Sequence, residues 1–194
     1  MSEAPVAGYT YGHVPRSPVT LEELRELEAT VGFTDDDRAC LLQANALLAD
    51  HAEALVEGWR KIIGSQPHLA RWFCGPDQRP DEAYKTAVKP RFVRWVVDLA
   101  SRPFDQAWLD YQHEIALRHT PAKKNATDGT QTPPLVPLRF LIGFLAPVIE
   151  SLSPLLRAQR WPSDEAERLQ AAWSKAVILT IALWSRAYTK EGLW

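Results

Sequence analysis

Residues 105–119 read Asp-Gln-Ala-Trp-Leu-Asp-Tyr-Gln-His-Glu-Ile-Ala-Leu-Arg-His, and this stretch predicts a helix with one apolar face. A period of 3.6 residues per turn aligns four side chains along that face: Trp108, Tyr111, Ile115 and His119. Thr120-Pro121 follows, and a residue before proline disfavours helical geometry, so the helix should end at about His119. The pattern therefore directs a histidine in the last turn of a helix toward the protein interior.

An inward histidine has two interpretations. Its ring nitrogens can be satisfied by nearby carbonyl groups, as in an ordinary core histidine, or one nitrogen can bind a metal ion. The other histidines are poorer candidates for ligation, because local hydrogen bonding explains each of them: His13, His51, His68 and His113.

The composition describes one domain with little net charge. A chain of 194 residues buries a substantial core but is short for two domains. Its net charge of −2 gives no electrostatic case for binding nucleic acid or an anionic membrane. The longest apolar runs, 140–149 and 176–184, are shorter than a membrane span of roughly 20 residues. The first five residues lack the features of a signal peptide, which predicts a cytoplasmic protein, and Cys40 and Cys74 are expected to be free thiols.

The remaining pattern is helical. No segment sustains the two-residue alternation of a strand, so the fold class is all-α. Residues 1–18 are rich in proline and glycine and predict an irregular extension. Capping residues at Thr20 and Thr34 begin the first two helices, to about 29 and 48. Further helices are predicted at 50–64, 67–72, 84–101, 104–119, 137–156 with a kink at Pro147, and 163–188, and a long loop at 120–134.

The run Tyr-Gln-X-Glu-Ile-X-Leu-Arg-His at 111–119, with Lys123-Lys124-Asn125 and Thr127-Asp128 after it, resembles the proximal helix and following loop of protoglobins. Protoglobins are single-domain heme proteins related to the sensor domains of globin-coupled sensors. Other parts of the chain also match: Gly-Tyr-Thr-Tyr-Gly at 8–12, Gly-Ser-Gln-Pro-His-Leu at 64–69, Arg-Phe-Val-Arg-Trp at 91–95 and Ala-Leu-Trp-Ser at 182–185. The resemblance implies a globin-like helical sandwich over residues 1–194, with an extra N-terminal segment and helix.

The resemblance also implies a site for heme b, iron protoporphyrin IX, with His119 as the axial iron ligand. It assigns the family's distal tryptophan and phenylalanine to Trp59 and Phe92. The other predicted heme contacts are Ile63, Val88, Phe144, Tyr111, Ile115 and Arg91. Pairing with the heme propionates is a role open to Arg91, Lys123 and Lys124, and the N-terminal extension is expected to fold over the heme edge.

Arg60 stands where the family has a distal tyrosine. One outcome is that its guanidinium turns toward solvent or a propionate and leaves an apolar pocket. The other is that it reaches the bound ligand as a cationic hydrogen-bond donor. The cost of burying an unpaired charge favours the first.

These features predict a globin that reversibly binds dioxygen, carbon monoxide or nitric oxide, for sensing, storage or detoxification. One alternative is a heme enzyme with peroxidase-like, nitric oxide dioxygenase or carbene-transfer activity, although no dedicated general base is evident. A second alternative is a heme-free globin-like interaction domain. The resemblance further implies a homodimer formed through the last two helices.

Overall fold

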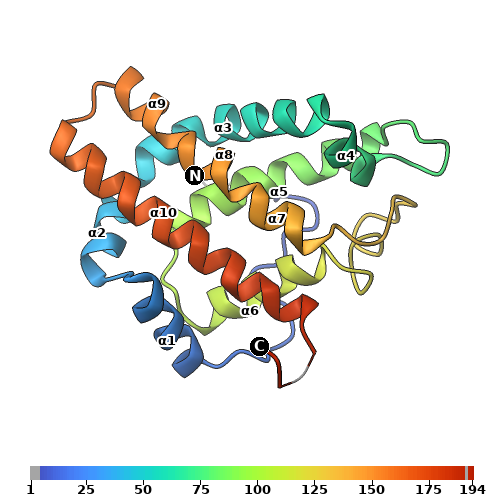
Figure 1. The fold of residues 1–194 in the computed structure, drawn as a ribbon, viewed down its shortest axis with the longest axis horizontal. Coiled ribbons are helices and arrows are strands. Elements are labelled where there is room, and N and C mark those ends of the chain that lie inside the picture. Colours follow the sequence, from blue (N-terminus) through green and yellow to red (C-terminus); the bar gives the residue numbers. More distant parts are fainter. Residues whose placement is uncertain (1–4, 191) are drawn as a thin grey trace.

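The computed structural model describes residues 5–190 and 192–194. Its helices, shown in Figure 1, are α1 Leu21–Val31, α2 Asp35–Gln43, α3 Asn45–Ser65, α4 Pro67–Ala70, η1 Arg71–Phe73, α5 Glu82–Ser101, α6 Gln106–Leu117, α7 Leu138–Gly143, α8 Leu145–Glu150, α9 Leu152–Ala158, α10 Ser163–Ser185 and η2 Arg186–Tyr188. The described residues form no strand, and their only β-type pairing is an isolated bridge between Cys74 and Pro80. The predicted all-α class is confirmed.

Both predicted capping residues begin helices. The Thr20 side chain accepts a hydrogen bond from the Glu23 backbone, and the Glu23 carboxylate accepts one from the Thr20 backbone. Thr34 and Asp37 form the same reciprocal pair at the start of α2. Each pair satisfies backbone N–H groups that the first turn of a helix leaves without partners.

The boundary between α2 and α3 differs from the prediction. The sequence pattern suggested a second helix reaching about residue 48 and a third beginning at residue 50, but the chain departs from helical geometry at Ala44. Ala44 has φ −84° and ψ 0°, a turn geometry that caps both helices. Leu48 consequently belongs to α3, where it is fully buried.

The segment predicted as one kinked helix is three short ones. Breaks occur at Phe144, three residues before Pro147, and at Ser151, three residues before Pro154. A proline has no N–H to donate and its ring crowds the carbonyl four residues earlier, so each proline interrupts the turn that precedes it. The sequence analysis identified the effect of Pro147 and missed that of Pro154.

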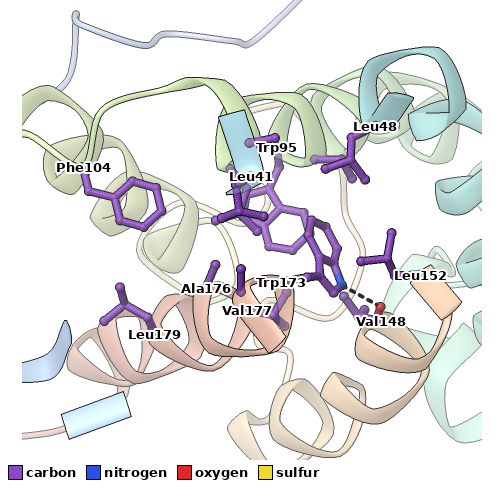
Figure 2. Packing of buried hydrophobic residues seen from close by; sticks show 14 of the residues in the cluster. Leu41, Leu48, Trp95, Phe104, Val148, Leu152, Trp173, Ala176, Val177 and Leu179 are labelled. Carbon is purple, nitrogen blue, oxygen red and sulfur yellow. Dashed lines mark hydrogen bonds between the residues drawn. The ribbon is translucent and has the colours of Figure 1, made fainter. Parts of the chain in front are cut away.

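Helix α10 packs against most of the other elements. It crosses the middle of the molecule in Figure 1, where it contacts α1, α2, α6 and α8, while α3 and α5 pack together on one side. Trp173 of α10 lies in the core with its side chain fully buried. Its Nε1 donates a hydrogen bond of 3.1 Å to the Val148 carbonyl (Figure 2). Trp173 therefore fastens α10 to α8 at the centre of the core.

Residues 138–158 form an apolar helical stretch. This is the one helical segment in the described part of the chain that is long and apolar enough to cross a membrane. Length and composition alone are weak evidence, because core helices also pass this test. Here the inner side chains of Val148, Leu152 and Leu156 are buried in the core.

A charged contact joins α2 to α10. The Lys175 ammonium donates to both carboxylate oxygens of Asp37 at 2.9 Å, and the same carboxylate takes part in the Thr34 cap. Burial acts to raise the pKa of Asp37, but hydrogen bonds from Lys175 and Thr34 outweigh it and lower the pKa below 3.8. The ionised carboxylate is therefore the form that the fold stabilises.

We predict that Asp37→Asn lowers the free energy of unfolding by about 1–2 kcal/mol at neutral pH, because a hydrogen-bonded charge is lost while the side-chain shape is kept. The pKa of Asp37 is lower in the folded than in the unfolded chain, so its contribution is present above pH 3.8 and disappears as the pH falls through the folded value. Urea unfolding of both proteins across this range measures the difference. A gap that stays constant into strong acid would contradict the assignment.

Candidate functional site

A cavity of about 230 Å³ lies between α5, α6, α7, α8 and α10. A single water molecule needs roughly 10–15 Å³ on a comparable measure, so the cavity has room for a large organic group. Its walls are mostly apolar. The described lining residues are Ile63, Leu69, Trp72, Phe73, Tyr84, Val88, Arg91, Phe92, Trp95, Tyr111, Ile115, Arg118, His119, Lys124, Thr127, Asp128, Val136, Phe140, Leu141, Phe144, Leu145, Val148, Val177, Thr180, Ile181 and Trp184.

His119 lies two residues beyond the end of α6. The helix ends at Leu117, earlier than predicted, because the last backbone bonds tighten: the His119 N–H donates to the Ala116 carbonyl at 3.0 Å. The His119 carbonyl then accepts from the Val136 N–H at 2.9 Å. The long loop is thereby tied back to the end of α6, and the backbone of His119 is held from both sides.

The imidazole of His119 is fixed in one tautomer. Its Nδ1 lies 2.9 Å from the Ile115 carbonyl oxygen, which can only accept a hydrogen bond. Nδ1 must therefore carry the proton, which leaves the lone pair on Nε2. Burial lowers the pKa of His119 to about 4, only partly offset by the hydrogen bond to Ile115 and reinforced by the charges of Lys124 and Arg118. At neutral pH the ring is neutral and able to donate a lone pair.

A tryptophan sets the plane of this ring. The rings of His119 and Trp184 stack with centroids 5.1 Å apart and an angle of 28° between their planes. The Trp184 Nε1 donates to the side-chain oxygen of Gln112 at 3.0 Å, and Gln112 is buried on α6. Residues of α6 and α10 thus jointly fix the orientation of the imidazole. In metal sites, neighbouring side chains orient ligating histidines in the same way.

Charged side chains gather at one end of the cavity. The guanidinium of Arg91 donates two hydrogen bonds to Asp128, at 2.8 and 2.6 Å. Arg118 donates to the Glu114 carboxylate at 3.0 Å and to the Gly8 carbonyl at 2.6 Å. Each arginine is therefore paired with a carboxylate.

The N-terminal segment covers the same end. The Tyr9 hydroxyl donates to Asp98 at 2.6 Å, and its ring packs edge-on against Tyr111 with centroids 5.1 Å apart. Gly8 has φ +73°, and a Cβ built there would come within 2.3 Å of the Arg91 guanidinium. The positive φ favours glycine at this crossing, and a larger residue would also have to displace the Arg91 guanidinium.

The structure brings most of the predicted site residues together. Among the cavity-lining residues are Ile63, Val88, Arg91, Phe92, Tyr111, Ile115, His119 and Phe144. Two predicted residues, Trp59 and Arg60, do not belong to the wall.

Trp59 occupies the core behind the cavity. Its Nε1 donates to the Ser151 hydroxyl at 3.1 Å, and its ring lies behind Phe92 with centroids 5.1 Å apart. Arg60 forms an ion pair of 3.7 Å with Glu57, one turn earlier on α3, and a quarter of its side chain is exposed. The Arg60 guanidinium is thus engaged by Glu57, and its direction relative to a bound ligand stays a prediction.

The sequence analysis did not identify the contact between Trp184 and His119 or its support by Gln112. A signal for Gln112 was present, because a polar residue seven positions before His119 lies on the same side of the helix. For Trp184 no local signal exists, since its partner is 65 residues away on another helix.

The helical arrangement and the cavity beside the end of α6 define a globin fold. The globin domain of a Geobacter sulfurreducens globin-coupled sensor superimposes with a TM-score of 0.66 at 15% identity, over 86% of this chain and 97% of that one. The globin domain of Escherichia coli DosC gives 0.61 in a ferric form and 0.59 in a ferrous form, each at 16% identity over 84% of this chain and 97% of the other.

The sequence model of the Protoglobin family matches residues 20–194, so this chain belongs to the Protoglobin family. No curated protein matches its sequence. The apolar stretch 138–158 is accordingly a helical part of a soluble globin domain.

We predict that the His119 ring stays neutral with its proton on Nδ1 down to about pH 5 and titrates only near its pKa of about 4. Because the unfolded chain takes up this proton at about pH 6.5, protonation also destabilises the fold as the pH falls below that value. Ring-nitrogen chemical shifts measured by NMR on the apoprotein report both tautomer and charge. A titration midpoint near 6.5 would mean that the ring is open to solvent.

Proposed function

We propose that this protein is a heme globin that reversibly binds diatomic gases, with His119 as the axial ligand of the iron. The observation that carries the proposal is the neutral His119 imidazole, fixed through Nδ1 and placed in the wall of a large apolar cavity. Family membership supports the same conclusion, since protoglobins are heme proteins.

The donor groups around the cavity fit heme better than a metal ion held by protein side chains alone. No cluster of three or more His, Cys, Asp or Glu residues in the described part of the chain is arranged to hold a metal ion. A metal beside His119 would therefore draw its other donors from a non-protein group. When bound, heme b supplies iron in a planar apolar macrocycle, with one axial position for a histidine and the opposite one open to a gas.

The cavity wall supplies apolar contact and little else. Val88 and Phe92 on α5, and Phe144 between α7 and α8, would pack against the macrocycle, with Ile115 beside His119. Such walls exclude water and keep the histidine neutral. Because Arg60 pairs with Glu57 and does not line the described cavity, the pocket would offer bound gases no arginine from this position.

The charges of the wall favour ligand binding over turnover. Asp128 is the one carboxylate among the described lining residues, and Arg91 holds both of its oxygens. A general base must be free to accept a proton from a substrate, and a carboxylate engaged in this way is poorly suited to the role. Sensing, storage or detoxification of dioxygen, carbon monoxide or nitric oxide suits such a site better than a dedicated enzyme activity.

Self-association is the second part of the proposal. Trp173 and Val177 of α10 are buried in the core and Trp184 lines the cavity, so an interface would use other side chains of the last helices. Other apolar side chains remain exposed on the two elements, with Ile142 of α7 at 52% and Ile178 of α10 at 40%. We propose that this surface packs against a second copy of the chain in a four-helix arrangement.

The cellular compartment follows from cysteine chemistry. Cys40 and Cys74 are both free thiols in the described chain. Reduced thiols persist in the cytoplasm, where disulfides are rare, so we propose a cytoplasmic location.

We predict that the purified protein reconstituted with hemin shows a Soret band that shifts when it is reduced under carbon monoxide. His119→Ala should abolish this spectrum or weaken heme binding by tenfold or more, roughly the effect of losing the protein's axial ligand. Absorption titration with hemin measures both quantities. His113→Ala is the matched control, because His113 lies on the same helix but not on the cavity wall, and it should keep the wild-type spectrum.

Retention of the complete spectrum and affinity in His119→Ala would refute the axial role. A wild-type protein that binds no hemin would instead leave a heme-free interaction domain as the function of this fold.

We predict that Ile142→Asp converts a dimer to a monomer, because a charge placed in an apolar interface loses its water shell. Sedimentation velocity measures the change. Leu42→Asp is the control, since Leu42 is 59% exposed on α2, away from α7, and should leave the association unchanged. A monomeric wild type, or equal effects of the two variants, would contradict this interface.

A further inference from the structure

The cations of the cavity wall are not equivalent. Among the described lining residues the positive side chains are Arg91, Arg118 and Lys124. Arg91 is neutralised by Asp128, and Arg118 by Glu114. Of these three cations, Lys124 is the one without a carboxylate partner in the described chain.

Neutral groups alone hold the Lys124 ammonium. Its Nζ donates to the Trp72 carbonyl at 2.9 Å and to the Thr132 hydroxyl, and it lies 4.9 Å from the centre of the Tyr84 ring. An ammonium has three donors, and these contacts use two of them. The third donor has no hydrogen-bond partner in the described chain, and Lys124 lines the cavity.

Lys124 is buried but remains charged. The residue is 2% exposed, and burial lowers the pKa of Lys124 from 10.5 to about 8. Since this pKa lies above 7, the protonated, charged form of Lys124 predominates at pH 7. A buried charge without a counter-ion is costly, and an anion that entered the cavity would remove that cost.

The contacts of the neighbouring Lys123 exclude it as a partner for an anion in the cavity. Lys123 does not line the cavity, and its ammonium donates to Glu114, the same carboxylate that holds Arg118. The sequence left Arg91, Lys123 and Lys124 as equal candidates for an anionic group, and the pairing pattern separates them.

We propose that Lys124 is the anion-binding residue of the cavity and that it pairs with a propionate carboxylate of heme. The inference rests on the proposed heme-binding function and adds to it the residue that neutralises the ligand's charged edge. Lys124 belongs to the loop after α6, and its ammonium donates a hydrogen bond to the Trp72 carbonyl of η1. Heme binding to Lys124 would therefore connect both segments to the ligand.

The test compares hemin with hemin dimethyl ester, in which the propionates carry no charge. Affinities of both for the wild type and for Lys124→Met are measured by absorption titration of the apoprotein. We expect Lys124→Met to weaken binding of hemin by tenfold or more, the typical effect of losing one charge-assisted hydrogen bond, and to change binding of the ester little. Lys123→Met should leave the ratio of the two affinities at its wild-type value.

Equal losses for the two ligands would assign Lys124 a structural role and overturn the inference while leaving the heme site intact. A wild type that binds neither ligand would overturn the proposed function as well. If Lys124→Met fails to fold, Lys124→Gln serves instead, because its amide keeps an N–H donor for the Trp72 carbonyl without the charge. The same ligand-dependent loss is expected of that variant.

Discussion

The hydrogen bond between His119 Nδ1 and the Ile115 carbonyl is the contact around which the rest of the site is organised. It forms where α6 ends at Leu117 and the chain tightens: the His119 N–H donates to the Ala116 carbonyl, and the Ile115 carbonyl accepts from the Arg118 N–H as well as from the His119 ring. The end of the helix therefore supplies the acceptor that selects the tautomer.

Two further elements are needed to keep this geometry. The loop after α6 returns to donate from Val136 to the His119 carbonyl, and the Tyr188 hydroxyl donates to Val136 at 2.8 Å. Helix α10 contributes Trp184 to the stack on the imidazole and Trp173 to the core. One helix thus connects the stability of the core to the orientation of the functional ring, so a change in α10 packing would be felt at His119.

Charged and apolar side chains occupy different parts of the cavity wall. The apolar walls stabilise the neutral form of His119, while the cationic side chains gather where the N-terminal segment and the loop after α6 meet. Two arginines there are neutralised by carboxylates, and the segment at Gly8 closes over them. The result is a cavity with an apolar interior and a single polar end, which suits a ligand that is itself apolar with a charged edge.

The sequence by itself determined the helical class, the capped starts of α1 and α2, and the inward direction of His119, because these depend on residues within a few positions of each other. It also placed eight of ten predicted site residues where the cavity lies. It did not determine the break at Ala44, which carries no proline or glycine signal, or the position of Arg60 outside the cavity wall.

Tertiary structure alone decided which side chains contact each other. Trp59 and Phe92 are both apolar and inward, yet only packing between α3 and α5 puts Phe92 on the wall and Trp59 behind it. Lys123 and Lys124 are adjacent and chemically identical, but the loop directs one to Glu114 and buries the other beside the cavity. Local sequence sets helix formation and the face of each side chain, whereas the choice of partner is made by contacts between residues far apart in the chain, for which one sequence contains no local pattern.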